Sequence, residues 1–247
     1  MSITTTDAAL LRLLAWLSPA FPTGGFAYSH GIEWAVEAGD VTNEPMLRDW
    51  LAGVLSHGAG RSDSILLHHA HRAAFDADML ADIAELAEAA APCRERRRET
   101  LDQGTAFVLA VSAWVPAPHP QPLPTRGRGV AASPSPLVGE GRGGGDWTAI
   151  AYPVAVGALA GQHGIDAHAA ACGYLQAFAA NLISAAVRLV PLGQSAGLRV
   201  LAALEPVLLK TANDAARSTL DDIGGCAFRS DLAAMRHETQ YTRLFRS

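Results

Sequence analysis

Apolar residues recur at helical spacing along nearly the whole chain. In the first such segment, from about Asp7 to Leu17, leucines at positions 10, 11, 13, 14 and 17 form a broad apolar face. Alanine and leucine are abundant, and no sustained alternation of apolar and polar residues indicates a strand. The pattern therefore predicts an all-α fold, a single compact helical domain of about ten helices.

Residues that end or begin helices divide the chain into segments. Two prolines and two glycines interrupt the helical pattern at 18–25, and Gly39 is placed to stop a helix. Asn43 is placed to cap the helix that follows, and Ser230 to cap the last one. The predicted helices span residues 7–17, 29–37, 43–57, 63–75, 78–90, 94–114, 147–162, 167–190, 195–217 and 230 onward.

Residues 116–145 differ from the rest of the chain. They hold seven of its 14 prolines and seven of its 23 glycines, without a periodic apolar pattern. Such a composition buries too little apolar surface to offset the entropy of ordering. We predict a disordered inserted loop, with a flexible binding arm as the alternative. The predicted helical domain is thus 1–229, interrupted by 116–145, and a docking tail follows at 230–247.

Charge and cysteine content exclude several classes of protein. The net charge of −5 argues against a nucleic-acid binder, which needs a basic face. Three cysteines without C-x-x-C spacing form neither a disulfide framework nor a zinc site. Residues 168–190 are long and apolar enough for a membrane span, but alanine predominates there and polar residues interrupt it, which predicts a buried central helix. The N-terminus lacks a signal peptide, so we expect a cytoplasmic protein.

The familiar catalytic motifs are absent from the sequence. It contains no G-x-S-x-G elbow, no H-E-x-x-H and no P-loop. The densest histidine cluster leaves open the alternative of a histidine-dependent metal enzyme; it comprises His57, His68, His69 and His71. The charge run at 94–99 is typical of a solvated helix face or a helix start.

The last thirteen residues, 235–247, have the composition of a binding segment. They include three arginines, a histidine, a tyrosine and a phenylalanine, and arginine and aromatic residues dominate binding hot spots. Leu232 and Met235 give the last helix only a thin apolar stripe, which predicts that the tail cannot dock firmly on its own domain. We interpret the tail as a docking segment for a partner, with a frayed, solvated helix as the alternative.

Three segments together resemble a known family. Residues 18–33, SPAFPTGGFAYSHGIE, are similar to the S-P-x-x-P-x-G-G-F-x-Y-S-x-G-x-E signature of the urease accessory protein UreF. Residues 188–194, RLVPLGQ, resemble the central helix break of that family, and residues 230–247 resemble its C-terminus. The insert at 116–145 is the one clear departure.

The resemblance implies a function as well as a fold. A UreF-like protein is an all-helical homodimer that works with UreD (also called UreH) and the GTPase UreG on urease apoprotein. It helps to load nickel and is not itself an enzyme. It holds no tightly bound cofactor, because UreG binds the GTP and the complex handles the nickel. A helical scaffold for an unrelated GTPase is the remaining alternative.

The resemblance also carries over to individual residues, all in partner-binding roles and none catalytic or metal-binding. In the tail, the residues that match the segment for UreD docking are Arg236, His237, Glu238, Tyr241 and Arg243. In the N-terminal motif, the residues expected at the dimer or UreG surface are Phe26, Tyr28, His30 and Glu33. At the central break, Arg188 and Gln194 are expected to contact a partner, with Arg188 linked to GTPase control.

Overall fold

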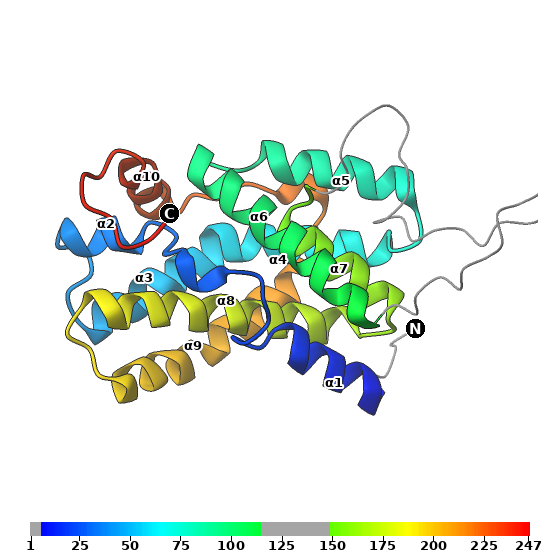
Figure 1. Ribbon diagram of the computed structural model, residues 1–247, viewed down its shortest axis with the longest axis horizontal. Coiled ribbons are helices and arrows are strands. Elements are labelled where there is room, and N and C mark those ends of the chain that lie inside the picture. The colour runs from blue at the N-terminus through cyan, green and yellow to red at the C-terminus, as the bar shows by residue number, and fades with distance from the viewer. Residues whose placement is uncertain (1–5, 115–148) are drawn as a thin grey trace, which may run out of the picture.

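The computed structural model describes residues 6–114 and 149–247 of the chain. Within these two ranges the chain forms ten α-helices, three short 3-10 helices and no strand, which confirms the predicted all-α fold (Figure 1). The predicted inserted loop at 116–145 lies outside the described residues. The α-helices are α1 (Asp7–Trp16), α2 (Ile32–Glu37), α3 (Glu44–His57), α4 (Ala59–Arg72), α5 (Ala77–Ala89), α6 (Arg94–Val111), α7 (Tyr152–Gln162), α8 (Ala167–Leu189), α9 (Gln194–Ala215) and α10 (Phe228–His237). The 3-10 helices are η1 (Gly25–Ala27), η2 (Ser112–Trp114) and η3 (Leu220–Asp222).

Local capping explains most of the helix ends. The Asn43 side chain accepts a hydrogen bond from the Met46 amide at 3.0 Å and starts α3, as predicted. Gly39, with φ of 79°, ends the turn after α2, also as predicted. The prediction that Ser230 caps the last helix is wrong, because α10 already begins at Phe228 and Ser230 is buried on its inner side.

The helix predicted from residue 29 begins three residues later, at Ile32. His30 and Gly31 precede it with φ of 57° and 77°, and a left-handed backbone cannot be part of a right-handed helix. Glycine is needed at position 31 for a second reason, because the backbone of α10 lies very close to it. A Cβ on Gly31 would lie 2.6 Å from the amide nitrogen of Ala234. The N-terminal motif therefore touches the C-terminal segment at this turn.

The core is built from closely packed helices rich in small residues. α7 lies against α4, and its glycines at 157 and 161 let the two backbones approach. A Cβ on Gly157 would lie 2.3 Å from the carbonyl oxygen of Leu67. Interiors of this kind tolerate little change in volume.

Helix α8 runs through the middle of the fold. Among the described residues it is the one helix that is long and apolar enough to cross a membrane by length and composition. Half of its most apolar stretch is buried inside the protein, and it packs against α4, α7 and α9. These contacts are those of the buried central helix that the sequence predicts.

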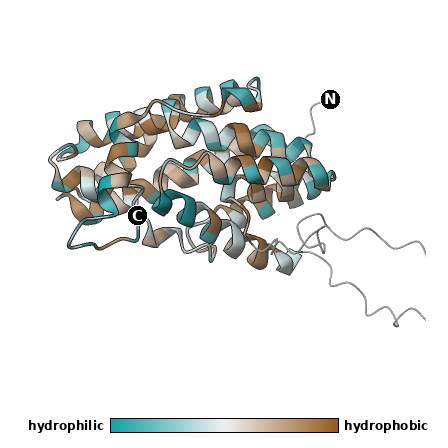
Figure 2. Ribbon diagram, turned by 90° about the horizontal axis from the view of Figure 1, so that it is seen from above, coloured by the Kyte–Doolittle hydropathy of each residue, from teal (hydrophilic) through white to brown (hydrophobic). Residues whose placement is uncertain are grey.

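Different helices form the two ends of the molecule. α10 and the C-terminus lie beside α2 at one end, and α1 lies at the other (Figure 1). Apolar and polar residues share most helices, as expected for amphipathic helices around one core (Figure 2). The outer side of α1 carries three exposed leucines, at positions 10, 11 and 14.

Candidate functional site

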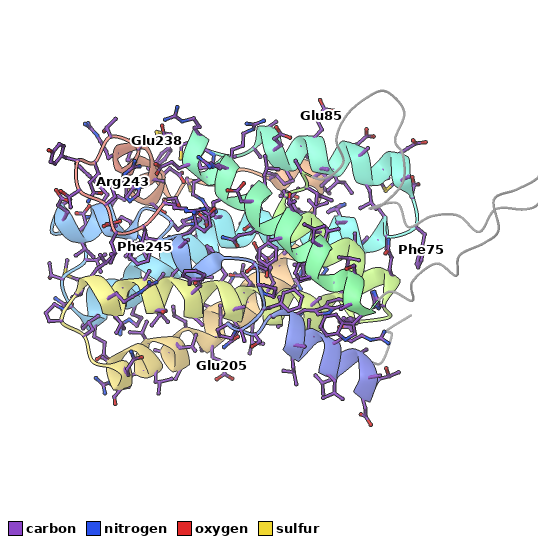
Figure 3. The ribbon with its side chains drawn as sticks, viewed as in Figure 1. Phe75, Glu85, Glu205, Glu238, Arg243 and Phe245 are labelled. Atoms are coloured by element: carbon purple, nitrogen blue, oxygen red, sulfur yellow. The ribbon has the colours of Figure 1, made fainter. Side chains whose placement is uncertain are left out.

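The C-terminal tail is docked on its own domain. His237 is fully buried, and Phe245 and Ser247 are 5% and 1% exposed. The prediction that the tail lacks a face for such docking is therefore wrong. It considered apolar area alone, whereas hydrogen bonds to glutamates of α2 and α6 hold the tail. Figure 3 shows Glu238, Arg243 and Phe245 gathered around the end of α10.

Glu33 of α2 is the main anchor for the tail. Its carboxylate accepts hydrogen bonds from the amides of Leu244, at 2.6 Å, and Phe245, at 2.9 Å. The Nε2 atom of His237 lies 3.1 Å from the same carboxylate. One buried side chain thus satisfies two backbone donors that would otherwise lack partners.

The start of α6 supplies the second anchor. Glu95 contacts His237 Nδ1 at 2.7 Å and accepts a hydrogen bond from Arg243 at 2.6 Å. The carboxylate of Glu238 accepts a hydrogen bond from the backbone amide of Glu95, at 3.2 Å, in the first turn of α6. A carboxylate at that position suits both the orphan amides and the dipole of a helix N-terminus.

The end of the tail lies against the N-terminal motif. The amide and hydroxyl of Ser29 donate to the carbonyl oxygen of Ser247 at 2.6 and 2.5 Å, and the Arg246 amide donates to Ala27 at 2.8 Å. The Ser247 hydroxyl donates to Glu99 of α6 at 2.6 Å. The N-terminal motif and the C-terminal segment are therefore joined by hydrogen bonds.

Arg188 brings in the third segment. Its guanidinium donates to the carbonyl oxygen of Phe26 at 3.0 Å and lies 4.4 Å from the centre of the Phe245 ring. All three sequence segments of the family resemblance therefore meet. We call this meeting point the motif junction, made of residues 26–33, Arg188 and residues 237–247.

The remaining predicted site residues divide into inner and outer positions. Tyr28 is buried, and its hydroxyl donates to Asp102 at 3.0 Å; burial, followed by Asp102, raises the pKa of this tyrosine. Phe26 and Tyr241 have exposed rings, and Arg236 is also exposed. Gln194 is exposed at the start of α9 and is not one of the residues that make up the motif junction.

The histidine cluster is dispersed in the structure. His69 and His71 bond through Nε2 to the carbonyl oxygens of Ser218 and Ile165, at 3.1 and 2.8 Å. Burial lowers the pKa of His68 to about 4. Within the described ranges no three His, Cys, Asp or Glu side chains are grouped to hold a metal ion. The geometry therefore gives no support to a histidine-dependent metal enzyme.

Sequence reasoning missed a cavity beneath the N-terminal loop that holds several charged and polar side chains. The cavity measures 280 Å³, and its wall includes Asp63, Arg96 and Tyr174. Tyr174 donates to Asp63 at 2.7 Å, and burial raises the pKa of Asp63 to about 6. Arg96 forms a buried ion pair with Glu99. The solvated face predicted for residues 94–99 is wrong at these two positions; both are charged residues within a charged run, so their composition does not mark them as buried.

The fold and the junction define an all-α protein in which an N-terminal loop, a central helix break and a C-terminal tail form one structural unit. The chain belongs to the UreF family of urease accessory proteins. The UreF family model matches residues 41–205. The chain is 53% identical to Urease accessory protein UreF of Rhodopseudomonas palustris (strain TIE-1), over 98% of this chain and 93% of that one. It is 51% identical to the protein of that name from Bradyrhizobium sp. (strain BTAi1), over 97% and 92%, and 47% identical to that of Mesorhizobium japonicum, over 98% of each.

Proposed function

We propose that this chain bridges UreD and the GTPase UreG in the complex that loads nickel into urease apoprotein. The relatives are named urease accessory proteins and not enzymes, and no nucleotide-binding motif occurs in this sequence. GTP is therefore bound by UreG, and nickel is the cargo of the complex. We further propose a cytoplasmic homodimer without a tightly bound cofactor.

The motif junction is the observation that carries this proposal. A tail that is held by buried glutamates presents its remaining side chains in a fixed arrangement, which lowers the entropy that a partner must overcome. Tyr241 is fully exposed and Leu244 is 66% exposed, although Leu244 is anchored through its amide. Both therefore face outward from a rigid support.

The inner and outer tail residues have different roles in the proposed docking. We propose that Arg236 and Tyr241 contact UreD directly, because both are exposed. His237, Glu238 and Arg243 instead hold the tail in place through Glu95. The contribution of His237 is then structural rather than a nickel contact.

The exposed residues outside the tail suit the other partners. Phe26 is 72% exposed beside Arg188, and Gln194 lies on the surface at the start of α9. We propose these positions for UreG or for a second copy of the chain. Tyr28 and His30 are buried and support that surface from below.

Co-purification with UreD and UreG, followed by urease activation with nickel, GTP and bicarbonate, tests the proposal. Wild type is expected to bind both partners and to activate urease. Tyr241→Ala is expected to weaken UreD binding at least tenfold, as loss of an aromatic hot spot does, while the matched control Phe75→Ala, another exposed aromatic, leaves it unchanged. Absence of binding and activation by wild type would refute the proposed function. Equal binding by both variants would refute the role of the tail.

A further inference from the structure

His30 stands out within the motif junction for its backbone and its burial. Among the described residues it is the one non-glycine residue with a positive φ, 57°, a conformation that side chains with a Cβ seldom adopt. The side chain is 4% exposed, and its ring packs edge-on against Phe178 of α8, with 5.1 Å between ring centres. Unusual backbone conformations persist where the surrounding structure enforces them.

The enforcing contacts come from the C-terminal segment. On one side of His30, Ser29 donates two hydrogen bonds to Ser247. On the other side, Gly31 touches the backbone of Ala234. One neighbour of His30 is thus held by the end of the tail and the other by α10, from which the tail extends, so the position of the imidazole and the docking of the tail depend on each other.

The surroundings of the imidazole suit only its neutral form. Its Nδ1 atom is buried and finds no hydrogen-bond partner among the described residues. Burial and, second, the positive charge of Arg96 hold the pKa of His30 well below its usual range. Other charged or titratable groups of the surrounding elements include Glu33 on α2, Glu99 on α6, Arg188 on α8, and Asp231 and His237 on α10.

We propose that His30 is a proton-operated release for the C-terminal tail: the tail stays docked while the imidazole is neutral, and it undocks when the ring takes up a proton. A charged ring with an unpartnered donor cannot remain in this site, and hydration requires its neighbours Ser29 and Gly31 to leave the tail. The tail is the segment that moves, because hydrogen bonds rather than a wide apolar face hold it.

The sign of the effect follows from proton linkage. The pKa of His30 is lower in the docked state than in the undocked state, where it is about 6.5. Above about pH 6.5 the imidazole is neutral in both states and docking is at its strongest. As the pH falls below about 6.5, the undocked state takes up a proton and becomes favoured. The docking equilibrium should then weaken about tenfold for each pH unit below that value. Mildly acidic conditions would expose the tail and remove the rigid support of Tyr241.

Hydrogen exchange of the full-length protein tests the release directly. The amides of Leu244, Phe245 and Arg246 report docking, since each donates to Glu33 or Ala27. Corrected for the intrinsic pH dependence of exchange, their protection factors should fall about tenfold between pH 7.5 and 5.5. In His30→Asn, which tolerates the left-handed conformation and does not titrate, the fall should be twofold or less.

Two further variants keep the test decisive. His30→Gln replaces His30→Asn if the latter fails to fold, as judged by circular dichroism. His237→Gln removes the other buried histidine of the junction but keeps a side chain that can bond to Glu33 or Glu95; provided that its tail amides are still protected at pH 7.5, it should retain the tenfold fall. The proposal is overturned if wild type shows no fall, if the His30 variants fall as steeply as wild type, or if the fall disappears in His237→Gln instead.

Discussion

The helical core and the motif junction are held together in different ways. In the core, small residues bring α4, α7 and α8 into close contact, and apolar side chains fill the space between them. In the junction, four glutamates at positions 33, 37, 95 and 99 accept hydrogen bonds from the tail. Polar contacts of this kind are specific in geometry and modest in net stability. The difference predicts a body that unfolds as a unit and a tail that opens on its own.

A substitution in the core should have the largest effect on global stability. Gly157→Ala places a Cβ 2.3 Å from the Leu67 carbonyl oxygen, so α7 and α4 must separate. We expect a loss of about 3 kcal/mol in the free energy of unfolding. Urea denaturation monitored by circular dichroism measures it. A change below about 0.5 kcal/mol, the size of a typical surface substitution, would show that the close α4–α7 contact is not needed.

Asp63 lies at the boundary between core and junction and gives a pH-dependent effect. Its folded pKa of about 6 is above the unfolded value, so the folded state binds more protons and stability falls as the pH rises from about 4 to 6. Asp63→Asn should therefore stabilise the protein by about 3 kcal/mol at pH 7 and by little at pH 4. Denaturation at the two pH values checks this; a variant less stable than wild type at pH 7 would contradict it.

Glu33→Gln should separate the junction from the core. The amide retains one acceptor oxygen but loses the charge that serves Leu244, Phe245 and His237. Hydrogen bonds to charged groups contribute about 1.5–3 kcal/mol, so tail docking should weaken by about 2 kcal/mol. Tail exchange should rise about thirtyfold, while the urea midpoint of the body changes little. If the urea midpoint of the body fell together with the protection of the tail, tail and body would form a single cooperative unit.

Tyr241→Ala should have the smallest effect on the fold. The side chain is fully exposed, so its removal should change the free energy of unfolding by less than about 0.5 kcal/mol. Thermal denaturation measures this quantity, and tail exchange should also remain at the wild-type rate. A clear destabilisation would mean that Tyr241 packs against its own chain, and its proposed role in UreD binding would lose its basis.

The same contrast explains what the sequence could and could not predict. Apolar spacing predicted the all-α fold and the central position of α8, because burial of an apolar face decides both. Docking of the tail depends on Glu33 and Glu95, which come from distant segments and have no periodic signature. The helix start at Ile32 was missed for a related reason, since contact with Ala234 fixes the turn before it.

The resemblance identified the segments of the junction but not the roles of their residues. Arg188 was expected to act on a partner, yet its guanidinium contacts Phe26 and Phe245 of its own chain. His237 was expected at an interface and is fully buried. A family signature marks residues that a fold requires, and it does not separate those that face a partner from those that support them.

The central claim is that the tail is docked on its own N-terminal motif before any partner binds. Hydrogen exchange of the isolated protein at pH 7.5 tests this claim most directly, through the amides of Leu244, Phe245 and Arg246. Docking predicts protection of at least about thirtyfold over an unstructured chain, and an approximately thirtyfold loss of that protection in Glu33→Gln. Exchange at the rate of an unstructured chain in the wild-type protein would contradict the account.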